Sequence, residues 1–289
     1  MLLLIICILF NTYIGIIFKY FKKYEVRTLH AIIINYIVCI LTASIVLGRP
    51  AITMATFSED WIWAAVLLGF TFVITFNLFA YTVQKLGVVI GSIFQKMSLI
   101  APAIIAIMLY GESSNLTKII GITLAILSIF LISLDKNTDN KSKASVSLWI
   151  LPIGTFIGSC IIDSGLFYIN KVNLVDSMSI DFIATLFFFA GILGSLFILY
   201  EYIKTKKTFR KKEIFAGIML GVPNFFSIYF LLKVLSNGMD ASVVFPINNV
   251  GILSLTALIG WTLFKESFTI RKLIGFVFAL ISIALLSLG

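Results

Sequence analysis

Charged residues are scarce in this chain. They make up 12% of its 289 residues, whereas hydrophobic residues make up 60%. A soluble globular protein carries about 25% charged and roughly 45–50% apolar residues. A water-soluble domain cannot bury so large an apolar fraction, so the composition excludes a soluble enzyme, a disulfide-rich secreted domain and a disordered chain. We therefore expect lipid to be the solvent for most of the chain.

Cysteine and histidine are also few, and their spacing excludes several kinds of chemistry. Cys7, Cys39 and Cys160 each lie in an apolar run without a CxxC pattern, and His30 is the single histidine. We interpret the three cysteines as small packing residues and expect no metal site. The chain contains no GxxxxGK[ST] loop, which argues against transport driven by ATP hydrolysis within it. The sequence implies no cofactor and no nucleic-acid partner.

Long apolar runs account for nearly all of the sequence. A membrane-spanning helix needs about 20 mostly apolar residues. Ten such runs can be marked, at 2–20, 29–48, 61–84, 86–110, 115–134, 148–171, 178–200, 214–234, 240–264 and 268–288. The runs do not alternate in hydrophobicity as barrel strands do. We expect an all-α integral membrane protein with ten transmembrane helices, in the cytoplasmic membrane.

Positive charge is distributed unevenly over the expected loops. The odd-numbered loops hold 17 of the 22 Lys and Arg residues, and the even-numbered loops hold four. The positive-inside rule then places the odd-numbered loops in the cytoplasm and both termini outside.

The most informative feature is an internal repeat. An offset of 154 residues pairs Glu112 with Glu266 and Ser113 with Ser267, and further matches are Lys118/Lys272, Gly121/Gly275, Ala125/Ala279, Ser128/Ser282 and Leu134/Leu288. The chain thus divides into five-helix halves at 1–135 and 148–289, joined by a polar linker at 136–147. A repeat with an odd number of spans re-enters the membrane upside down, so we expect inverted repeats, an architecture typical of secondary transporters.

These features resemble a known family. Two five-helix repeats, each with a Gly/Lys-Glu-Ser…Lys-Ile/Leu-Ile-Gly hairpin before its last helix, are similar to the EamA-type members of the drug/metabolite transporter superfamily. The resemblance covers essentially the whole chain. It implies a ten-helix basket around a central cavity that moves small metabolites such as amino acids, often by export. It also implies termini in the cytoplasm, opposite to the orientation that the loop charges predict.

One lysine stands deep inside an expected span. Lys96 lies ten residues after Leu86 and fourteen before Tyr110, which is at least about 15 Å from either end of a helix. Its side chain is too short to reach the interface, so it must face protein or a water-filled cavity. It can bind a carboxylate or phosphate of a substrate, or form a structural ion pair. Asp163, inside the sixth run, is its candidate counter-charge, either as a proton-coupling group or as a plain lining carboxylate.

Amides and prolines complete the candidate site. Gln95 matches Asn249 at the same offset, and Asn248 is adjacent, so these amides can bind substrate or join helices. Asn77 and Asn224 are further candidate binding residues. Three prolines within spans are candidate hinges because proline removes a helical hydrogen bond: Pro102, Pro223 and Pro246.

The sequence thus predicts a secondary transporter, not an enzyme, that moves a small carboxylate-bearing metabolite by alternating access. Its expected partners are that small molecule and the lipid bilayer, with proton coupling left open, and it acts as a monomer or homodimer. The alternative is an intramembrane enzyme acting on a lipid-linked substrate. That enzyme would need an acid/base or nucleophile pair at one membrane face, and no such motif is present.

Overall fold

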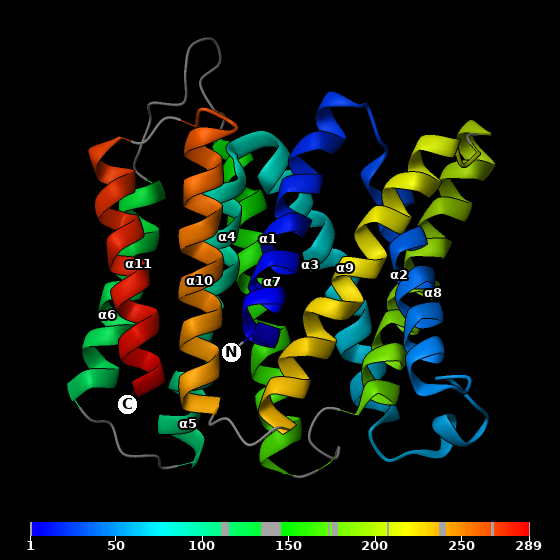
Figure 1. Ribbon diagram of the computed structural model, residues 1–289, viewed down its shortest axis with the longest axis horizontal. Coiled ribbons are helices and arrows are strands. Elements are labelled where there is room, and N and C mark those ends of the chain that lie inside the picture. The colour runs from blue at the N-terminus through cyan, green and yellow to red at the C-terminus, as the bar shows by residue number, and fades with distance from the viewer. Residues whose placement is uncertain are drawn as a thin grey trace.

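The computed structural model describes residues 2–110, 116–133, 146–172, 174, 179–206, 208–236, 241–266 and 269–288, and helices dominate them (Figure 1). No strand occurs among these residues. The helices are α1 (Leu2–Lys23), α2 (Thr28–Leu47), α3 (Ile62–Leu86), α4 (Val88–Lys96), α5 (Ile100–Tyr110), α6 (Leu116–Ser133), α7 (Ile150–Lys171), α8 (Ile180–Thr205), α9 (Lys211–Ser236), α10 (Ala241–Thr262) and α11 (Ile270–Leu288). Short 3-10 helices are η1 (Ala55–Ser58), η2 (Met97–Leu99) and η3 (Val146–Trp149). Residues 111–115 and 136–145, with Glu112 and most of the predicted linker, lie outside the described residues.

Several of these helices are long and apolar enough to cross a membrane. In the described part of the chain seven stretches qualify: Leu2–Lys23, Thr28–Leu47, Ile62–Leu86, Val88–Leu109, Ile150–Ile169, Ile180–Thr205 and Lys211–Leu231. Two shorter apolar helical stretches are Leu116–Leu131 and Ile247–Thr262. The chain is therefore a multi-pass, all-helical membrane protein.

The fourth predicted span differs from the expectation of one continuous helix. The helix ends at Lys96, passes through the 3-10 turn η2 and resumes as α5. Pro102 explains the break, because its nitrogen cannot donate to the carbonyl of Ser98 and its ring would clash there. The predicted span at 86–110 is matched by the qualifying stretch Val88–Leu109, and its break lies beside Pro102, which the sequence marks as a candidate hinge.

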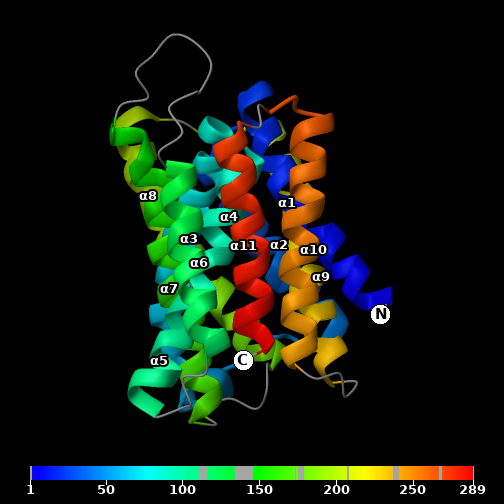
Figure 2. The ribbon, with the colours of Figure 1, turned by 90° about the vertical axis from the view of Figure 1, so that its left-hand side faces the viewer.

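The two largest buried cores among the described residues hold most of the bundle together. The first core joins apolar residues of α1, α2, α3, α8 and α9 around Phe18, Tyr36 and Phe187. The second core joins α4, α6, α10 and α11 around Phe94 and Leu253. Each core contains helices from both sequence halves, so the halves interlock rather than form separate bodies. Figure 2 shows α1, α9 and α10 gathered on one face, with α3, α7 and α8 toward the opposite one.

Helices α6 and α11 pack side by side through two matching hydrogen bonds (Figure 1). The Ser128 hydroxyl donates to the Gly275 carbonyl at 2.7 Å, and the Ser282 hydroxyl donates to the Gly121 carbonyl at 2.8 Å. The offset of 154 residues relates Ser128 to Ser282 and Gly121 to Gly275, so the two bonds are equivalent under the repeat. Residue numbers rise along one helix as they fall along the other, so the two helices run antiparallel.

One end of the bundle carries many of the basic residues. This basic end comprises residues 22–27, 85–88, 208–213 and 263–266, whose segments contact one another. The loops after the first, third, seventh and ninth predicted spans therefore lie together, as alternating spans require. At the opposite end, Arg49 and Asp181 form an ion pair at 2.7 Å.

Candidate functional site

Lys96 lies at the break in the fourth predicted span. It is the last residue of α4, and η2 follows it directly. In α4 every residue from Val88 to Phe94 is buried, whereas Gln95 and Lys96 are half-buried. Two helical turns that are buried on all faces do not touch lipid. Gln95 and Lys96 are therefore the first residues of this helix, after seven buried ones, that keep accessible surface.

Asp163 of α7 lies near this lysine. The Asp163 carboxylate accepts a hydrogen bond from the hydroxyl of Ser98 in η2. The same hydroxyl lies 2.6 Å from the backbone oxygen of Gln95. The charges of Lys96 and Asp163 interact, but the two groups do not form a direct ion pair among the described residues. The Lys96 ammonium thus has the Asp163 carboxylate nearby without a direct contact to it.

Cys7 brings α1 to the same region. Its Sγ lies 3.0 Å from the Ser227 carbonyl oxygen of α9 and 3.3 Å from Oδ1 of Asn248 in α10. Asn11, one turn further along α1, donates to the Cys7 carbonyl at 3.0 Å. The Cys7 thiol also interacts electrostatically with the Lys96 ammonium. The structure therefore brings the predicted residues Gln95, Lys96, Asp163 and Asn248 to one region. We call these four residues, together with Cys7 and Ser98, the central polar cluster.

The remaining predicted amides have other surroundings. Asn249, next to Asn248, is buried in α10. Asn224 of α9 donates to Oδ1 of Asn35 at 3.1 Å, so it joins α9 to α2. Asn77 donates to the Val73 carbonyl of its own helix at 2.8 Å. Asn224 and Asn77 are thus engaged in helix pairing and in their own helix, and the structure gives neither a contact with Lys96.

The predicted hinge prolines are distributed over three helices. Pro102 lies in the first turn of α5, just past the break, and Pro223 lies inside α9. Pro246 falls within α10, two residues before Asn248. Each removes one backbone donor from its helix. Of the three, Pro102 is the one within a helical turn of a stretch, residues 97–99, where the described backbone departs from an α-helix.

A second charged cluster lies at the basic end. The Glu266 carboxylate accepts hydrogen bonds from the backbone nitrogens of Val88 and Val89, at 2.9 and 3.4 Å, and pairs with Lys19 at 3.0 Å. Acidic groups at a helix N-terminus are stabilised by its free N–H groups and dipole. Glu266 therefore ties the start of α4 to α1 and to the segment after α10.

Gly87 makes this capping possible. It has a φ of 109°, and a Cβ built there would lie 2.6 Å from a Glu266 carboxylate oxygen. No other residue type fits that approach without displacing the carboxylate.

Sequence reasoning missed two parts of this arrangement. Cys7 was interpreted as plain apolar packing, yet its sulfur lies between two polar groups. The one available signal was Asn11, four residues later and hence on the same face of the first helix. Glu266 was noticed only as a repeat marker, and nothing in the sequence indicated that it caps α4.

Comparison with known proteins agrees with the multi-pass helical fold. The model of the EamA-like transporter family matches residues 1–134 and 150–288. An uncharacterized protein of Haemophilus influenzae is 28% identical over 287 residues, which covers 97% of this chain and 95% of that protein. A protein of known crystal structure has the same fold, with a TM-score of 0.58 at 10% identity over 96% of this chain and 95% of that one.

Proposed function

Because this chain belongs to the EamA-like transporter family of membrane transporters, we propose that it is a secondary carrier for a small carboxylate-bearing metabolite, acting in export by alternating access. The observation that carries the proposal is Lys96, a half-buried residue at a helix break inside the bundle. A cation is costly in a membrane interior and is retained where it binds a charged partner. A carboxylate, including that of an amino acid or a related compound, is such a partner.

The surroundings of Lys96 support binding of a polar molecule. Asn248 and Gln95 offer amide groups, and the helix breaks directly after the lysine. Discontinuous helices are typical of binding sites in transporters. Asp163 sits beside Lys96 without a direct ion pair, so substrate can take the ammonium while Asp163 keeps its bond from Ser98. We propose Asp163 as the group that couples transport to protons.

One feature supports inverted halves, and a second supports alternating access between the two cores. The matching bonds of Ser128 and Ser282 are those expected when two five-helix units are related by a two-fold axis between α6 and α11. The central polar cluster also joins both cores, since Cys7 belongs to α1 of the first core and Lys96 ends α4 of the second. Movement of one core against the other would open this cluster to either side. We propose that the carrier acts in the cytoplasmic membrane.

A transport screen tests the proposal. Proteoliposomes would be loaded with a mixture of amino acids and other carboxylates, and efflux and uptake measured by mass spectrometry with and without a pH gradient. We expect the wild type to move a subset of the carboxylates faster than empty liposomes. The variant Lys96→Ala should abolish that movement. Lys85→Ala, which removes an exposed lysine at the end of α3, is the matched control and should leave it unchanged.

Two results would contradict the proposal. Movement of none of the compounds by the wild type would remove the substrate class. Equal transport by wild type and Lys96→Ala, with both proteins inserted in equal amounts, would remove Lys96 from the site.

A further inference from the structure

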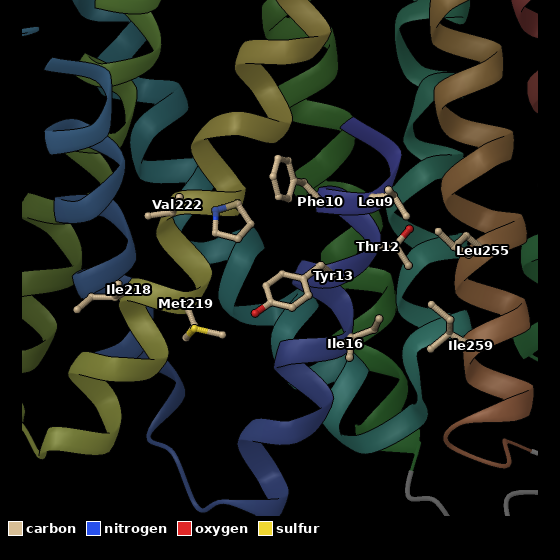
Figure 3. Close-up of a pocket in the computed structure, with 11 residues that line it drawn as sticks. Leu9, Phe10, Thr12, Tyr13, Ile16, Ile218, Met219, Val222, Leu255 and Ile259 are labelled. Atoms are coloured by element: carbon tan, nitrogen blue, oxygen red, sulfur yellow. The ribbon is translucent and has the colours of Figure 1, made fainter. Parts of the chain in front are cut away.

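An open groove on the face formed by α1, α9 and α10 has no role in the proposed transport cycle. Helices α9 and α10 contact each other little, while both pack on α1, which forms the floor between them. Figure 3 shows the groove, with a volume of about 580 Å³. Its lining consists of Leu9, Phe10, Thr12, Tyr13, Ile16, Ile218, Met219, Val222, Pro223, Leu255 and Ile259.

The lining selects a hydrocarbon occupant. Among the described residues that line the groove, Thr12 and Tyr13 are the polar ones. A polar metabolite would lose its hydration there without gaining hydrogen bonds, which is unfavourable. Leu9, Ile218 and Met219 are 51%, 46% and 40% exposed, so the groove is open at the surface of a chain that lies in lipid. An acyl chain matches both the lining and the opening.

The floor of the groove leads to exposed lysines at the basic end. Positions 9, 13, 16, 20 and 23 recur every three or four residues and therefore share one face of α1. That face passes from Leu9, Tyr13 and Ile16 to Tyr20 and then Lys23. The Lys23 ammonium lies 5.9 Å from the ring centre of Tyr20 and 5.7 Å from that of Tyr24. No ion pair among the described residues includes Lys23 or its exposed neighbour Lys22.

The distance along α1 fits one leaflet. Ten residues separate Tyr13 from Lys23, which corresponds to about 15 Å at 1.5 Å per residue. One leaflet contributes half of the roughly 30 Å hydrocarbon core, or about 15 Å. A lipid whose phosphate contacts Lys22 and Lys23 would therefore place its acyl chain along the groove.

We propose that this groove is a binding site for an anionic phospholipid of the leaflet at the basic end. Its acyl chain lies between α9 and α10 against α1, and its headgroup phosphate contacts Lys22 and Lys23. Attraction of basic residues near a membrane surface to anionic lipids adds to the burial of the chain. The site lies beside Cys7 and Asn248 on the same helices, yet the proposal does not depend on which substrate the protein moves.

Photo-crosslinking in defined vesicles tests the acyl part of the site. The full chain would be reconstituted with phosphatidylglycerol that carries a diazirine in its acyl chain, and labelled peptides would be mapped by mass spectrometry. We expect label to concentrate at residues 9–16, 218–222 and 255–259. Leu255→Trp should fill the groove and lower labelling there about tenfold. Excluding two methylene groups of the acyl chain from the groove is enough to weaken binding of the lipid by about that factor.

Two further variants keep this test decisive. Val222→Trp fills the groove from α9 at a position that is 38% exposed, and it should act like Leu255→Trp if that variant does not fold. Leu199→Trp, at a 53% exposed position on α8 away from the groove, is the matched control and should not lower the labelling. Label spread evenly over lipid-facing helices, or unchanged by both groove variants, would overturn the proposal.

The headgroup part has its own test. The double variant Lys22→Gln/Lys23→Gln should reduce labelling by phosphatidylglycerol to the level of a matched phosphatidylcholine probe. Lys204→Gln/Lys206→Gln is the control, since these lysines also lie over tyrosine rings near the basic end but on α8 and just after it. Equal labelling by both lipids in the wild type would overturn the contact between the lysines and the headgroup.

Discussion

At the scale of single residues, the proposed binding residue Lys96 and the buried Glu213 differ in how fully their charges are paired. Lys96 is half-buried and has a nearby counter-charge that does not pair with it directly. Glu213, at the basic end, is fully enclosed and bonded on both oxygens: Arg27 donates at 2.5 and 2.6 Å, and Arg210 donates from its Nε at 2.6 Å. The first arrangement leaves the Lys96 charge free for the substrate that we propose, whereas in the second the paired charges hold the start of α2 to α9.

Glu213→Gln should therefore destabilise the fold without acting on substrate binding. The Arg27 guanidinium stays charged when the carboxylate is removed, because arginine is protonated at any physiological pH even without a partner. Breaking a buried pair costs about 3–5 kcal/mol, and the 20% and 44% exposure of the two arginine side chains lowers our expectation to about 2–3 kcal/mol. Thermal unfolding in detergent measures the loss.

Glu59→Gln is the matched control for that experiment, because Glu59 is exposed in the loop before α3. Its melting temperature should equal that of the wild type. A melting temperature of Glu213→Gln equal to that of the control would contradict a structural role for the pair.

At the scale of elements, apolar run length predicted the helices well but could not show where a helix is interrupted. The runs at 29–48 and 61–84 match α2 and α3 to within two residues. The run at 86–110 is equally apolar, so hydrophobicity alone predicted one helix. The break depends on Pro102 acting on the carbonyl of Ser98, a local effect that an apolar count does not contain. Cys7 was missed for a similar reason, since its polar contacts come from α9 and α10 far along the chain.

The break itself can be tested with Pro102→Ala. Alanine restores the missing donor and favours a continuous helix through residues 97–99, so we expect unchanged or higher thermal stability with strongly reduced transport. Pro152→Ala is the matched control, because Pro152 also stands third in its helix but at the start of α7. Full transport by Pro102→Ala would show that the break is not needed.

The cap on α4 can be tested at Gly87. Gly87→Ala combines strain at φ 109° with displacement of the Glu266 carboxylate, whereas Gly48→Ala combines strain at φ 66° with open space. Left-handed strain at Gly48 costs about 1 kcal/mol, whereas the φ of 109° and ψ of 162° at Gly87 lie in a region nearly restricted to glycine. We expect Gly87→Ala to cost about 1–2 kcal/mol more than Gly48→Ala in thermal unfolding, from this strain together with the lost cap. Equal losses for the two variants would contradict the capping role of Glu266.

At the scale of the whole molecule, the repeat in the sequence anticipated a contact that the structure contains. The offset of 154 residues paired Ser128 with Ser282 and Gly121 with Gly275, and these four residues form the two matching bonds between α6 and α11. The sequence could not show that each buried core would combine helices of both halves. That arrangement arises from packing between segments far apart in the chain, and it places the central polar cluster where the two cores meet.

Access to this cluster from both sides of the membrane is the central claim, and Gln95→Cys tests it most directly. The three native cysteines would be replaced, and the new thiol would be exposed to a charged, membrane-impermeant reagent in vesicles of either orientation. Alternating access predicts modification from both sides, with a transported substrate slowing the reaction. Modification from one side only, or from neither, would contradict the account.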